Sequence, residues 1–294
     1  YKSIEWRDCF KDLKALLATH HTDRASFKEY WGKDHSAPTL ENMMLDSDAG
    51  SMDALERPEI LSKLPSLQGK RVLELGAGIG RFSGTLAQKA DKVVAVDFVE
   101  ASCVENRRAN ADKPNLEVIT ADVTMLQLEP NSFDLIFSNW LLMYLSDDEV
   151  EAFAKNVLSW LRPGGSFFCR ESCFHASGNA ARRFNPTRYR DPETYTQMFS
   201  DVALSDGSRF QLLATNCVES YAKIKGNMFQ MWFRWEKLGR SASERRWRNL
   251  EIGQFSSAKG LRYEKIYGRG YIYTGGDVVS QKMLDACDGW LVPG

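Results

Sequence analysis

The sequence predicts an α/β fold built around a mostly parallel β-sheet. From residue 71 onward, short apolar runs alternate with amphipathic stretches of helix length, which is the pattern of parallel strands joined by helical crossovers. A glycine-rich turn follows the first run, and an acidic residue follows each of the next two. Ligands of such sheets bind outside the carboxyl ends of the strands, so these residues indicate one shared binding crevice.

Residues 1–65 are expected to form a helical lid ahead of the sheet. This segment is polar and rich in Met and Asp, and helical patterns occur around residues 6–17 and again near residues 27–31. We expect the helical region to end at Pro58 and Pro65, because proline interrupts a helix.

Residues 66–225 are expected to form the core domain that binds the ligand. The apolar runs predict strands at residues 71–75, 92–97, 116–120, 133–138 and 166–171. The amphipathic stretches predict helices at residues 81–89, 99–111, 147–161 and 192–201.

The remainder of the chain is less regular. Residues 209–214 and 218–223 are expected to pair as a hairpin, which would give the sheet an antiparallel end. Residues 226–260 are expected to form a helical cap, with helices around 228–238 and 243–252. The aromatic stretch 228–235 is assigned to the buried face of that cap. Residues 261–294 are expected to form a linker toward a second domain that the chain does not contain.

Composition and charge narrow the class of function. The chain has 294 residues, of which 43% are hydrophobic and 26% are charged, as in an ordinary soluble protein. Its 38 Lys and Arg against 39 Asp and Glu give a net charge of -1, which argues against a nucleic-acid partner. The longest apolar stretch, residues 135–145, is shorter than the roughly 20 residues that span a bilayer, so no membrane partner is expected.

The cysteines and histidines do not suggest a metal site or a disulfide framework. The six cysteines include no C-x-x-C spacing, and there is no H-E-x-x-H motif among the four histidines. We therefore expect reduced thiols, no metal and a cytoplasmic location. As a separate expectation, we predict a monomer. These thiols are Cys9, Cys103, Cys169, Cys173, Cys217 and Cys287.

The glycine-rich turn contains Gly76, Gly78 and Gly80 and is followed by Arg81. A dinucleotide-binding turn has the spacing G-x-G-x-x-G, and here the third glycine comes one position early, with Arg81 in its place. This spacing disfavours NAD. Glu74 places a carboxylate beside the turn, which favours a cationic ligand over a pyrophosphate.

Two acidic residues at strand ends suit an adenosine. Asp97 can accept hydrogen bonds from two ribose hydroxyls, while Asp122 and the backbone of Val123 suit the amino group and a ring nitrogen of adenine. Together with the glycine turn and Glu74, these features indicate S-adenosylmethionine. The alternative is that the glycines and aspartates are ordinary turn and cap residues.

Several motifs outside this turn are distinctive: Ser138-Asn-Trp-Leu-Leu-Met-Tyr144, Arg170-Glu-Ser-Cys-Phe-His175, and the segments 30–31, 35–36, 43–47, 56–60 and 185–191. With the glycine turn they resemble the N-terminal methyltransferase domain of the plant and nematode phosphoethanolamine N-methyltransferases. The resemblance implies a class I S-adenosylmethionine-dependent methyltransferase fold with a seven-stranded sheet. It also implies N-methylation of phosphoethanolamine, the first step toward phosphocholine and phosphatidylcholine.

The resemblance also implies roles for individual residues. Those that match cofactor positions of the family are Gly76, Gly78, Arg81, Asp97, Asp122, Val123 and Asn139. Those that match phosphobase positions are Ser172, Ser177, Gly178, Arg182 and Tyr189. Hydroxyls, a glycine N–H and a guanidinium form a donor set suited to a phosphate. Without the resemblance, the arginines at 182, 183, 188 and 190 would be interpreted as a solvated basic face. Lys223 and Lys225 are weaker candidates for the phosphate.

The catalytic residues are predicted from the chemistry of the amine. A primary ammonium must lose a proton before its nitrogen can attack, and we expect Tyr30 and Tyr144 to lie near that nitrogen. Single-domain relatives carry an Asp and a His where this sequence has Trp140 and Tyr144, which disfavours a simple Tyr–His dyad. His35 or His175 is an alternative, and the aromatic faces of Trp140 and Tyr144 suit a methylated amine or the core.

Two other functions compete with this hypothesis. The chain could methylate another small amine or a nucleobase, although segment 139–142 lacks the motif that grips an extruded base. It could also be a regulatory domain that binds the cofactor without turnover, since a fold alone carries no activity. If it is one half of a longer enzyme, we expect that it does not complete all three methylations.

Overall fold

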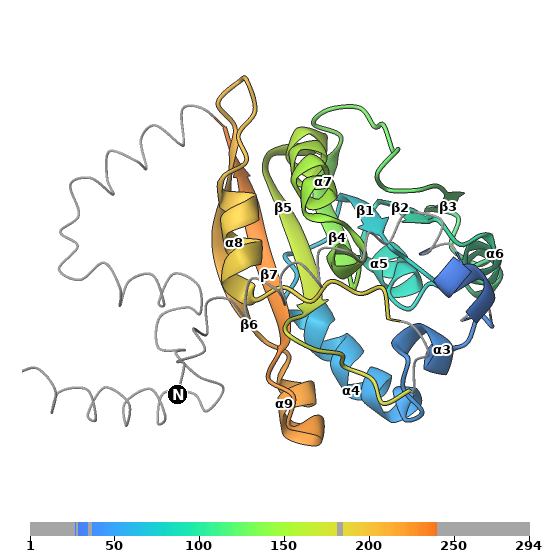
Figure 1. Ribbon diagram of the computed structural model, residues 1–294. Helices are drawn as coiled ribbons and strands as arrows, with labels where there is room; N and C mark the ends of the chain where they lie inside the picture. Colours follow the sequence, from blue (N-terminus) through green and yellow to red (C-terminus); the bar gives the residue numbers. More distant parts are fainter. Residues whose placement is uncertain (1–26, 28, 35–36, 181–184, 240–294) are drawn as a thin grey trace, which may run out of the picture.

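The computed structural model describes residues 27, 29–34, 37–180 and 185–239 (Figure 1). They form a seven-stranded sheet in the order β3-β2-β1-β4-β5-β7-β6. The first five strands are parallel, and β7 is antiparallel to both β5 and β6. The α/β class and the mostly parallel sheet are therefore confirmed.

Four of the five parallel strands begin and end close to the predicted positions, whereas β5 ends as predicted but begins at Leu161, ahead of the predicted residue 166. Their bounds are Arg71–Leu75 for β1, Lys92–Asp97 for β2, Leu116–Thr120 for β3, Phe133–Asn139 for β4 and Leu161–Ser172 for β5. In the central strands nearly every residue is buried, as expected where helices cover both faces of a sheet. This explains why they appear in the sequence as continuous apolar runs.

The predicted crossover helices are also present. They are α5 at Ser83–Lys89, α6 at Glu100–Ala109, α7 at Asp147–Trp160 and α8 at Pro192–Ser200. Helix α7 begins with a capping box, in which Ser146 and Glu149 satisfy each other's backbone N–H groups. The Asp191 side chain caps α8, and Pro192 occupies the first turn, where a missing N–H costs nothing.

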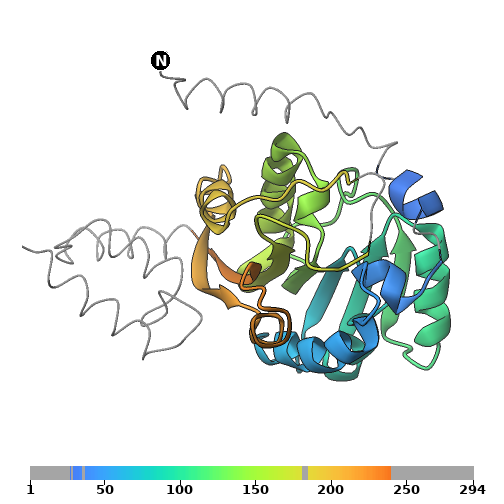
Figure 2. The same cartoon turned by 60° about the horizontal axis from the view of Figure 1, so that its bottom comes forward.

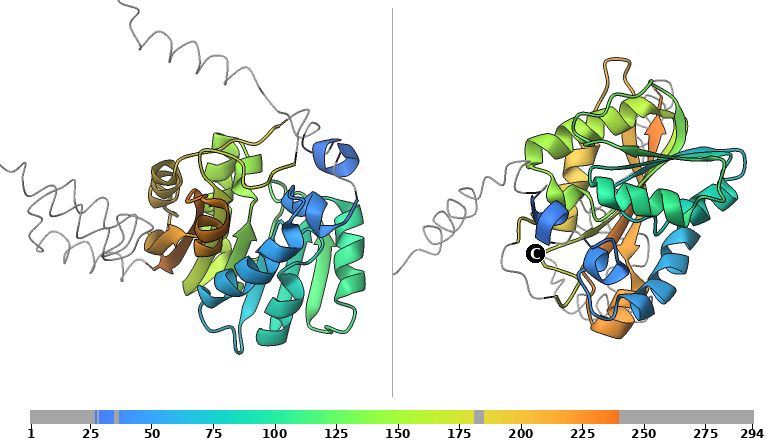
Figure 3. Two further views of the ribbon diagram at one scale, coloured as in Figure 1. Left: turned by 90° about the horizontal axis from the view of Figure 1, so that it is seen from below. Right: turned by 90° about the vertical axis from the view of Figure 1, so that its right-hand side faces the viewer.

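Helices cover both faces of the sheet (Figures 1 and 2). On one face, α7 and α8 pack against apolar side chains of the strands, such as Leu73 and Phe167. On the other face lie α4 (Ala49–Ser62), α5 and α9 (Glu219–Lys225), which pack against residues such as Val72 and Phe168 (Figure 3). The sheet is thus the middle layer of three.

The prediction for the C-terminal part of the core was wrong. Residues 209–214 do lie in a strand, β6 (Arg209–Cys217), but the segment predicted as its partner forms α9. The true partner is β7 (Gln230–Leu238), in the segment predicted as a cap helix. Because β7 lies inside the sheet, Phe233 and Trp232 are buried on opposite faces. A strand buried on both faces has no alternating pattern that distinguishes it from a buried helix.

These findings also change the predicted domain boundaries. β7 pairs with β5 and β6, so residues 230–238 belong to the core sheet and no helical cap begins at residue 226. The predicted helix at 243–252, the rest of the cap and the linker at 261–294 lie outside the described residues.

The N-terminal region is helical where it is described. It contains the short helix η1 (Tyr30–Asp34), α3 (Leu40–Met44) and α4. Contrary to prediction, α4 continues through Pro58 and ends at Ser62. Pro58 is on the exposed side of the helix, whereas Met52, Glu56 and Ile60 are buried and hold the opposite side against the core. The predicted helix at 6–17 lies outside the described residues.

Candidate functional site

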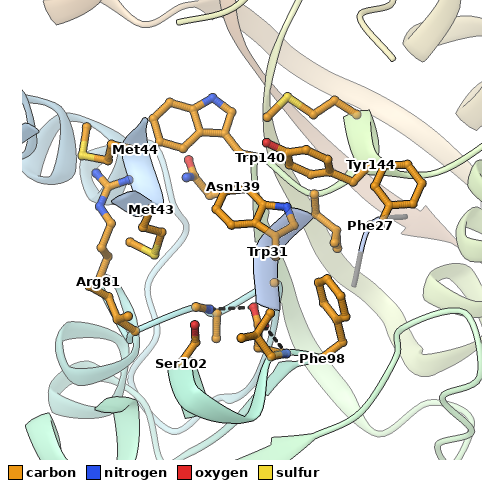
Figure 4. A pocket seen from close by; sticks show the side chains of 18 of the residues that line it. Phe27, Trp31, Met43, Met44, Arg81, Phe98, Ser102, Asn139, Trp140 and Tyr144 are labelled. Atoms are coloured by element: carbon orange, nitrogen blue, oxygen red, sulfur yellow. Dashed lines mark hydrogen bonds between the residues drawn. The ribbon is translucent and has the colours of Figure 1, made fainter. Parts of the chain in front are cut away.

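One pocket lies at the carboxyl ends of the parallel strands (Figure 4). Its floor comes from the loops after β1, β2, β3 and β4, each of which contributes residues of the predicted site. Its other walls come from the N-terminal helices and from the segment after β5. The predicted site residues that line it are Gly76, Gly78, Arg81, Asp97, Asp122, Val123, Asn139, Tyr144, Ser172, Ser177 and Tyr189.

The glycine turn allows the backbone to approach both the ligand and the neighbouring helix. Gly76, Gly78 and Gly80 all have positive φ angles, of 73°, 53° and 88°. A Cβ atom on Gly80 would lie 2.4 Å from Oδ1 of the buried Asn106 on α6. The third glycine thus gives close contact with a helix, as in a dinucleotide-binding turn, although its position in the sequence is different.

Asp97 is fixed beside this turn. Its Oδ2 accepts a hydrogen bond from the N–H of Gly78 at 2.8 Å, and its Oδ1 accepts one from the N–H of Val99 at 2.9 Å. Burial raises the pKa of Asp97 above its ordinary value, although the N–H groups of Val99 and Gly78 act to lower it. Each oxygen keeps acceptor capacity, because a carboxylate offers about four lone-pair sites. This arrangement suits the two vicinal hydroxyls of a ribose.

Asp122 and Val123 lie at the neighbouring strand end. Oδ1 of Asp122 accepts hydrogen bonds from the backbone N–H of Thr124 at 3.0 Å and from its hydroxyl at 2.8 Å. These bonds hold the loop after β3 in an Asx-type turn. Val123 is buried and packs in the same core cluster as the strands.

Arg81 and Asn139 each carry a buried polar atom that is not hydrogen-bonded to any described residue. In Arg81 the atom is Nη1, whereas its Nε donates to Asp53 at 2.8 Å and its Nη2 donates to Glu56 at 3.2 Å. In Asn139 the atom is Oδ1. A buried donor and a buried acceptor in one pocket require a ligand or water. An amino-acid tail, with its carboxylate and its ammonium, has the matching groups.

Glu74 lies under the turn as predicted, but its ionisation is different from what the sequence implies. Burial raises the pKa of Glu74 to about 8, despite the 2.5 Å hydrogen bond from the Ser83 hydroxyl. Burial thus favours the protonated form of Glu74 when no cation is bound. A cationic ligand would stabilise the charged form and lower this pKa.

Aromatic side chains of the N-terminal segment and of the segment after β4 form the opposite wall. The rings of Trp31 and Tyr144 meet edge to face with centroids 5.4 Å apart, and Phe27 packs against Tyr144 in the same way at 6.1 Å. Figure 4 shows these side chains together with Trp140 and Asn139. Tyr30 is buried behind Trp31, at a centroid distance of 5.4 Å, and is not a lining residue. Of the two tyrosines predicted as catalytic, Tyr144 therefore lines the pocket and Tyr30 does not. Trp31 also lines the pocket, although it was not predicted as a site residue.

Trp140 is held in an unusual position. Its φ angle is 56°, which a bulky residue rarely adopts. Its indole N–H donates to Oε1 of Gln230 at 3.1 Å, and the hydroxyl of Ser172 donates to the same oxygen at 3.0 Å. Gln230 thereby links a pocket aromatic to a predicted phosphobase residue. Sequence analysis missed Gln230 because its partners come from distant segments.

The other predicted phosphobase residues differ in position. Gly178 is not a lining residue, and a Cβ atom there would lie 2.0 Å from the carbonyl oxygen of Leu45. Its lack of a side chain therefore lets this loop pack against the lid. Arg182 lies outside the described residues. Arg190, in contrast, is buried and does not belong to a solvated face.

The candidate histidine and lysines within the described residues lie elsewhere. The Nδ1 atom of His175 lies 2.9 Å from the carbonyl oxygen of Ala176, and His175 is not a lining residue. His35 lies outside the described residues. Lys223 pairs with Glu219, and Lys225 pairs with the buried Asp46.

Metal-site, membrane and cysteine features can be assessed only for the described part of the chain. There, no group of three His, Cys, Asp or Glu side chains is arranged to hold a metal ion. No helix in those ranges is long and apolar enough to cross a membrane. The four cysteines within them are buried and free: Cys103, Cys169, Cys173 and Cys217.

Comparison with known proteins identifies close relatives. Residues 72–165 match a family model described as a methyltransferase domain. The chain is 44% identical to phosphoethanolamine N-methyltransferase 1 of Triticum aestivum over 90% of its own length and 55% of that protein. It is 44% identical to phosphoethanolamine N-methyltransferase 3 of Arabidopsis thaliana over 95% of its own length and 58% of that protein.

A solved structure of a protein with the same name is also similar to this chain. Haemonchus contortus phosphoethanolamine N-methyltransferase 1, in complex with phosphoethanolamine and S-adenosylhomocysteine, matches with a TM-score of 0.72 at 32% identity. The match covers 91% of this chain and 55% of that chain. The chain thus has the class I S-adenosylmethionine-dependent methyltransferase fold, and it spans about half the length of the relatives it matches.

Proposed function

This chain belongs to the phosphoethanolamine N-methyltransferase family, and from that membership we propose that it N-methylates phosphoethanolamine with S-adenosylmethionine. The product would be phospho-monomethylethanolamine, on the route to phosphocholine and phosphatidylcholine. We assign it the first methylation, because its motifs resemble those of the family's N-terminal domain, which is associated with that step.

The observation that carries this proposal is the pocket itself, where cofactor and acceptor groups meet. On the cofactor side, the carboxylate of Asp97 would accept from the ribose hydroxyls, and the loop at Asp122 and Val123 would bind the adenine. Nη1 of Arg81 would donate to the carboxylate of the methionine tail, and Oδ1 of Asn139 would accept from its ammonium. Bound S-adenosylmethionine would supply a methyl group activated by its sulfonium.

The acceptor side offers hydroxyl groups and aromatic rings. Ser177 and Tyr189 line the pocket and would donate to the phosphate, together with Arg182 and the Gly178 N–H. Ser172 also lines the pocket, and its hydroxyl would have to exchange its hydrogen bond to Gln230 for one to the phosphate. Trp140 and Tyr144 would present aromatic surface to the amine end. The arrangement would hold the nitrogen in line with the methyl group, and such positioning contributes much of the rate of a transfer reaction.

The amine must lose its proton before it attacks. Of the two predicted tyrosines, Tyr144 lines the pocket and Tyr30 is buried behind Trp31. We therefore assign Tyr144 the direct role of accepting a hydrogen bond from the amine and passing its proton to water. Tyr30 would act through Trp31 by holding the aromatic wall in place.

We also propose a cytoplasmic location, a monomeric state and a lid formed by residues 1–65. The free, buried cysteines support a reducing compartment. The lining residues Phe27, Trp31 and Met43 support the lid, since they come from the segment before β1 and cover the pocket.

The proposed reaction can be tested by transfer of a labelled methyl group from S-adenosylmethionine to phosphoethanolamine, with ethanolamine as a parallel acceptor. We expect transfer to phosphoethanolamine only, and its loss in Arg182→Ala, because the phosphate then lacks its guanidinium partner. Tyr144→Phe should lower kcat by about 100-fold, as expected for loss of a proton-accepting group, and Tyr30→Phe should lower it less.

The competing functions predict other outcomes. Equal transfer to ethanolamine would contradict a phosphate site and favour an enzyme for another small amine. Cofactor binding without transfer to any acceptor would favour the regulatory domain.

A further inference from the structure

Four buried charged side chains, two acids and two bases, form a cluster beside the pocket, and the exposed side of the cluster is closed by Arg57, which pairs with Asp53 at 3.0 Å. Asp53 and Glu56 come from α4, Arg81 follows the glycine turn, and Arg170 lies on β5. Glu56 and Arg170 have no exposed surface, and Asp53 and Arg81 are each 6% exposed. Burying charges is costly unless they are paired, so the two acids and two bases must stay together.

Glu56 is the residue that joins the two arginines. Its Oε2 lies 3.2 Å from Nη2 of Arg81, and its Oε1 lies 3.0 Å from Nη2 of Arg170. Asp53 contacts only the first of these arginines within the cluster, through a 2.8 Å hydrogen bond from Nε. Removing the Glu56 carboxylate would therefore disturb both guanidinium groups at once.

Each arginine acts on a different part of the pocket. Arg81 lines it and keeps Nη1 available for a ligand. Arg170 does not line it, but its guanidinium carbon lies 3.5 Å from the centroid of the Trp140 ring, which does. Arg81 contacts the same ring at 5.5 Å. Glu56 thus pairs with Arg81, on the cofactor side of the pocket, and with Arg170, which stacks on the ring of Trp140 on the acceptor side.

We infer that Glu56 is a positioning residue, which orients Arg81 toward the amino-acid tail of the cofactor and Trp140 toward the acceptor. This inference rests on the proposed function and deepens it. It also gives a role to the motif at residues 56–60, which the predicted site did not use. In that motif Arg57 donates to the carbonyl of Arg81 at 3.2 Å, so α4 holds both the side chain and the backbone of Arg81.

The matched control lies in the same motif. Glu59 is also on α4, but its carboxylate accepts from the backbone N–H groups of Glu219 and Ser220, at 2.7 and 2.9 Å. It therefore ties α4 to α9 and contacts neither arginine of the cluster. Glu59→Gln removes a carboxylate from the same helix without touching Arg81 or Arg170.

The experiment compares two cofactor analogues on the full chain by calorimetry. S-adenosylhomocysteine has the amino-acid tail, and 5′-methylthioadenosine lacks it. We expect the wild type and Glu59→Gln to prefer S-adenosylhomocysteine by the same ratio of Kd values. In Glu56→Gln we expect this preference to fall by about tenfold, because a charge-assisted hydrogen bond to the tail is lost. The affinity for 5′-methylthioadenosine should change less than about threefold.

Other results would overturn the inference. An equal loss of affinity for both analogues would mean that Glu56 only supports the fold, and an unchanged ratio would mean that it does not orient Arg81. If Glu56→Gln does not fold, Glu56→Asp replaces it in the experiment, because it keeps the charge but shortens the side chain. The ratio of the two Kd values then tests the inference in the same way. A wild-type chain that binds S-adenosylhomocysteine but methylates nothing would contradict the proposed reaction and leave this test valid.

Discussion

At the scale of single residues, the site combines charged groups whose states depend on burial. Glu74 and Asp97 both lie at the ends of central strands, and burial raises the pKa of each. Their difference is in their partners. Asp97 accepts two backbone N–H groups and keeps its position for a ribose, whereas Glu74 has the Ser83 hydroxyl as its hydrogen-bond donor.

The buried Glu74 predicts a dependence of stability on pH. Its pKa is about 8 in the fold against 4.5 for an ordinary glutamate, so between these values the folded state binds a proton that the unfolded state releases. The stabilisation from this proton is complete below pH 4.5 and is lost as the pH rises toward 8. Each pKa unit corresponds to about 1.4 kcal/mol.

This dependence can be measured by urea unfolding of the cofactor-free chain at pH 5 and pH 8. The Glu74→Gln variant should gain stability relative to the wild type as the pH rises. Between pH 5 and pH 8 the gain should be several kcal/mol, since each pH unit contributes about 1.4 kcal/mol. Glu151→Gln, which changes an exposed carboxylate on α7, should show a constant difference. A constant difference for Glu74→Gln as well would contradict a raised pKa.

The residues predicted for the cofactor side all line the pocket, whereas those predicted for the acceptor side do so only in part. The glycines, Asp97 and Asp122 are adjacent to strands that a sequence pattern identifies, so their convergence follows from the parallel sheet. The acceptor side depends on contacts between distant segments. Trp31 and Gln230 come from opposite ends of the described chain, and no spacing connects them.

At the scale of elements, the segment after β4 is held from two sides. The buried carboxylate of Glu171 accepts hydrogen bonds from the N–H groups of Leu141, Leu142 and Met143, at 3.0, 2.8 and 3.2 Å. Burial raises the pKa of Glu171 to about 7, although these N–H groups act to lower it. The guanidinium of Arg190 binds two carbonyl oxygens of the same segment, those of Leu142 and Leu145.

Arg190 therefore connects the element that carries Tyr144 to the segment that carries Tyr189. It donates to the carbonyl oxygen of Leu142 at 3.0 Å and to that of Leu145 at 2.7 Å, and it pairs with Asp147 at 2.7 Å. Arg190→Met should lower the free energy of unfolding by about 2–3 kcal/mol, because its charge-assisted bonds are lost and the Leu145 carbonyl loses this donor, whereas the Leu142 carbonyl keeps the N–H of Leu145. It should also lower kcat, since Tyr144 loses its support.

Arg188→Met is the matched control for this prediction. Arg188 lies two residues away and contributes its backbone N–H to the carbonyl of Met143 at 2.7 Å, a bond that the substitution keeps. Thermal or urea unfolding and the methyl-transfer assay should both distinguish the two variants. Equal effects of the two substitutions would mean that the side chain of Arg190 does not hold the segment.

Element boundaries were predicted well where the pattern was regular. The five parallel strands and four crossover helices follow the alternation of apolar runs and amphipathic stretches. The strand β7 was assigned to a helix because its aromatic side chains are buried on both faces, which removes the alternation of a half-exposed strand. Pro58 was expected to end a helix, but it faces solvent while the buried side of α4 packs on the core.

At the scale of the whole molecule, the chain matches about half of each relative. If the remaining half of such enzymes is needed for later methylations, this chain should stop after the first. Incubation with phosphoethanolamine and an excess of S-adenosylmethionine should then yield the monomethylated product, identified by mass spectrometry. Phosphocholine formed by this chain alone would contradict the assignment of a single step. As a control, the monomethylated phosphobase is offered as the substrate, and it should not be methylated further.

The sequence by itself determined the α/β class, the positions of the parallel strands along the chain, and the loops that follow these strands at the pocket. These features depend on local periodicity and on turns that follow directly after strands, so each is encoded within a short window. Only the tertiary structure decided that β7 lies inside the sheet, that Tyr30 lies behind Trp31, and that Glu56 joins Arg81 to Arg170. Such relations depend on the packing and charge pairing of segments that are far apart in the chain.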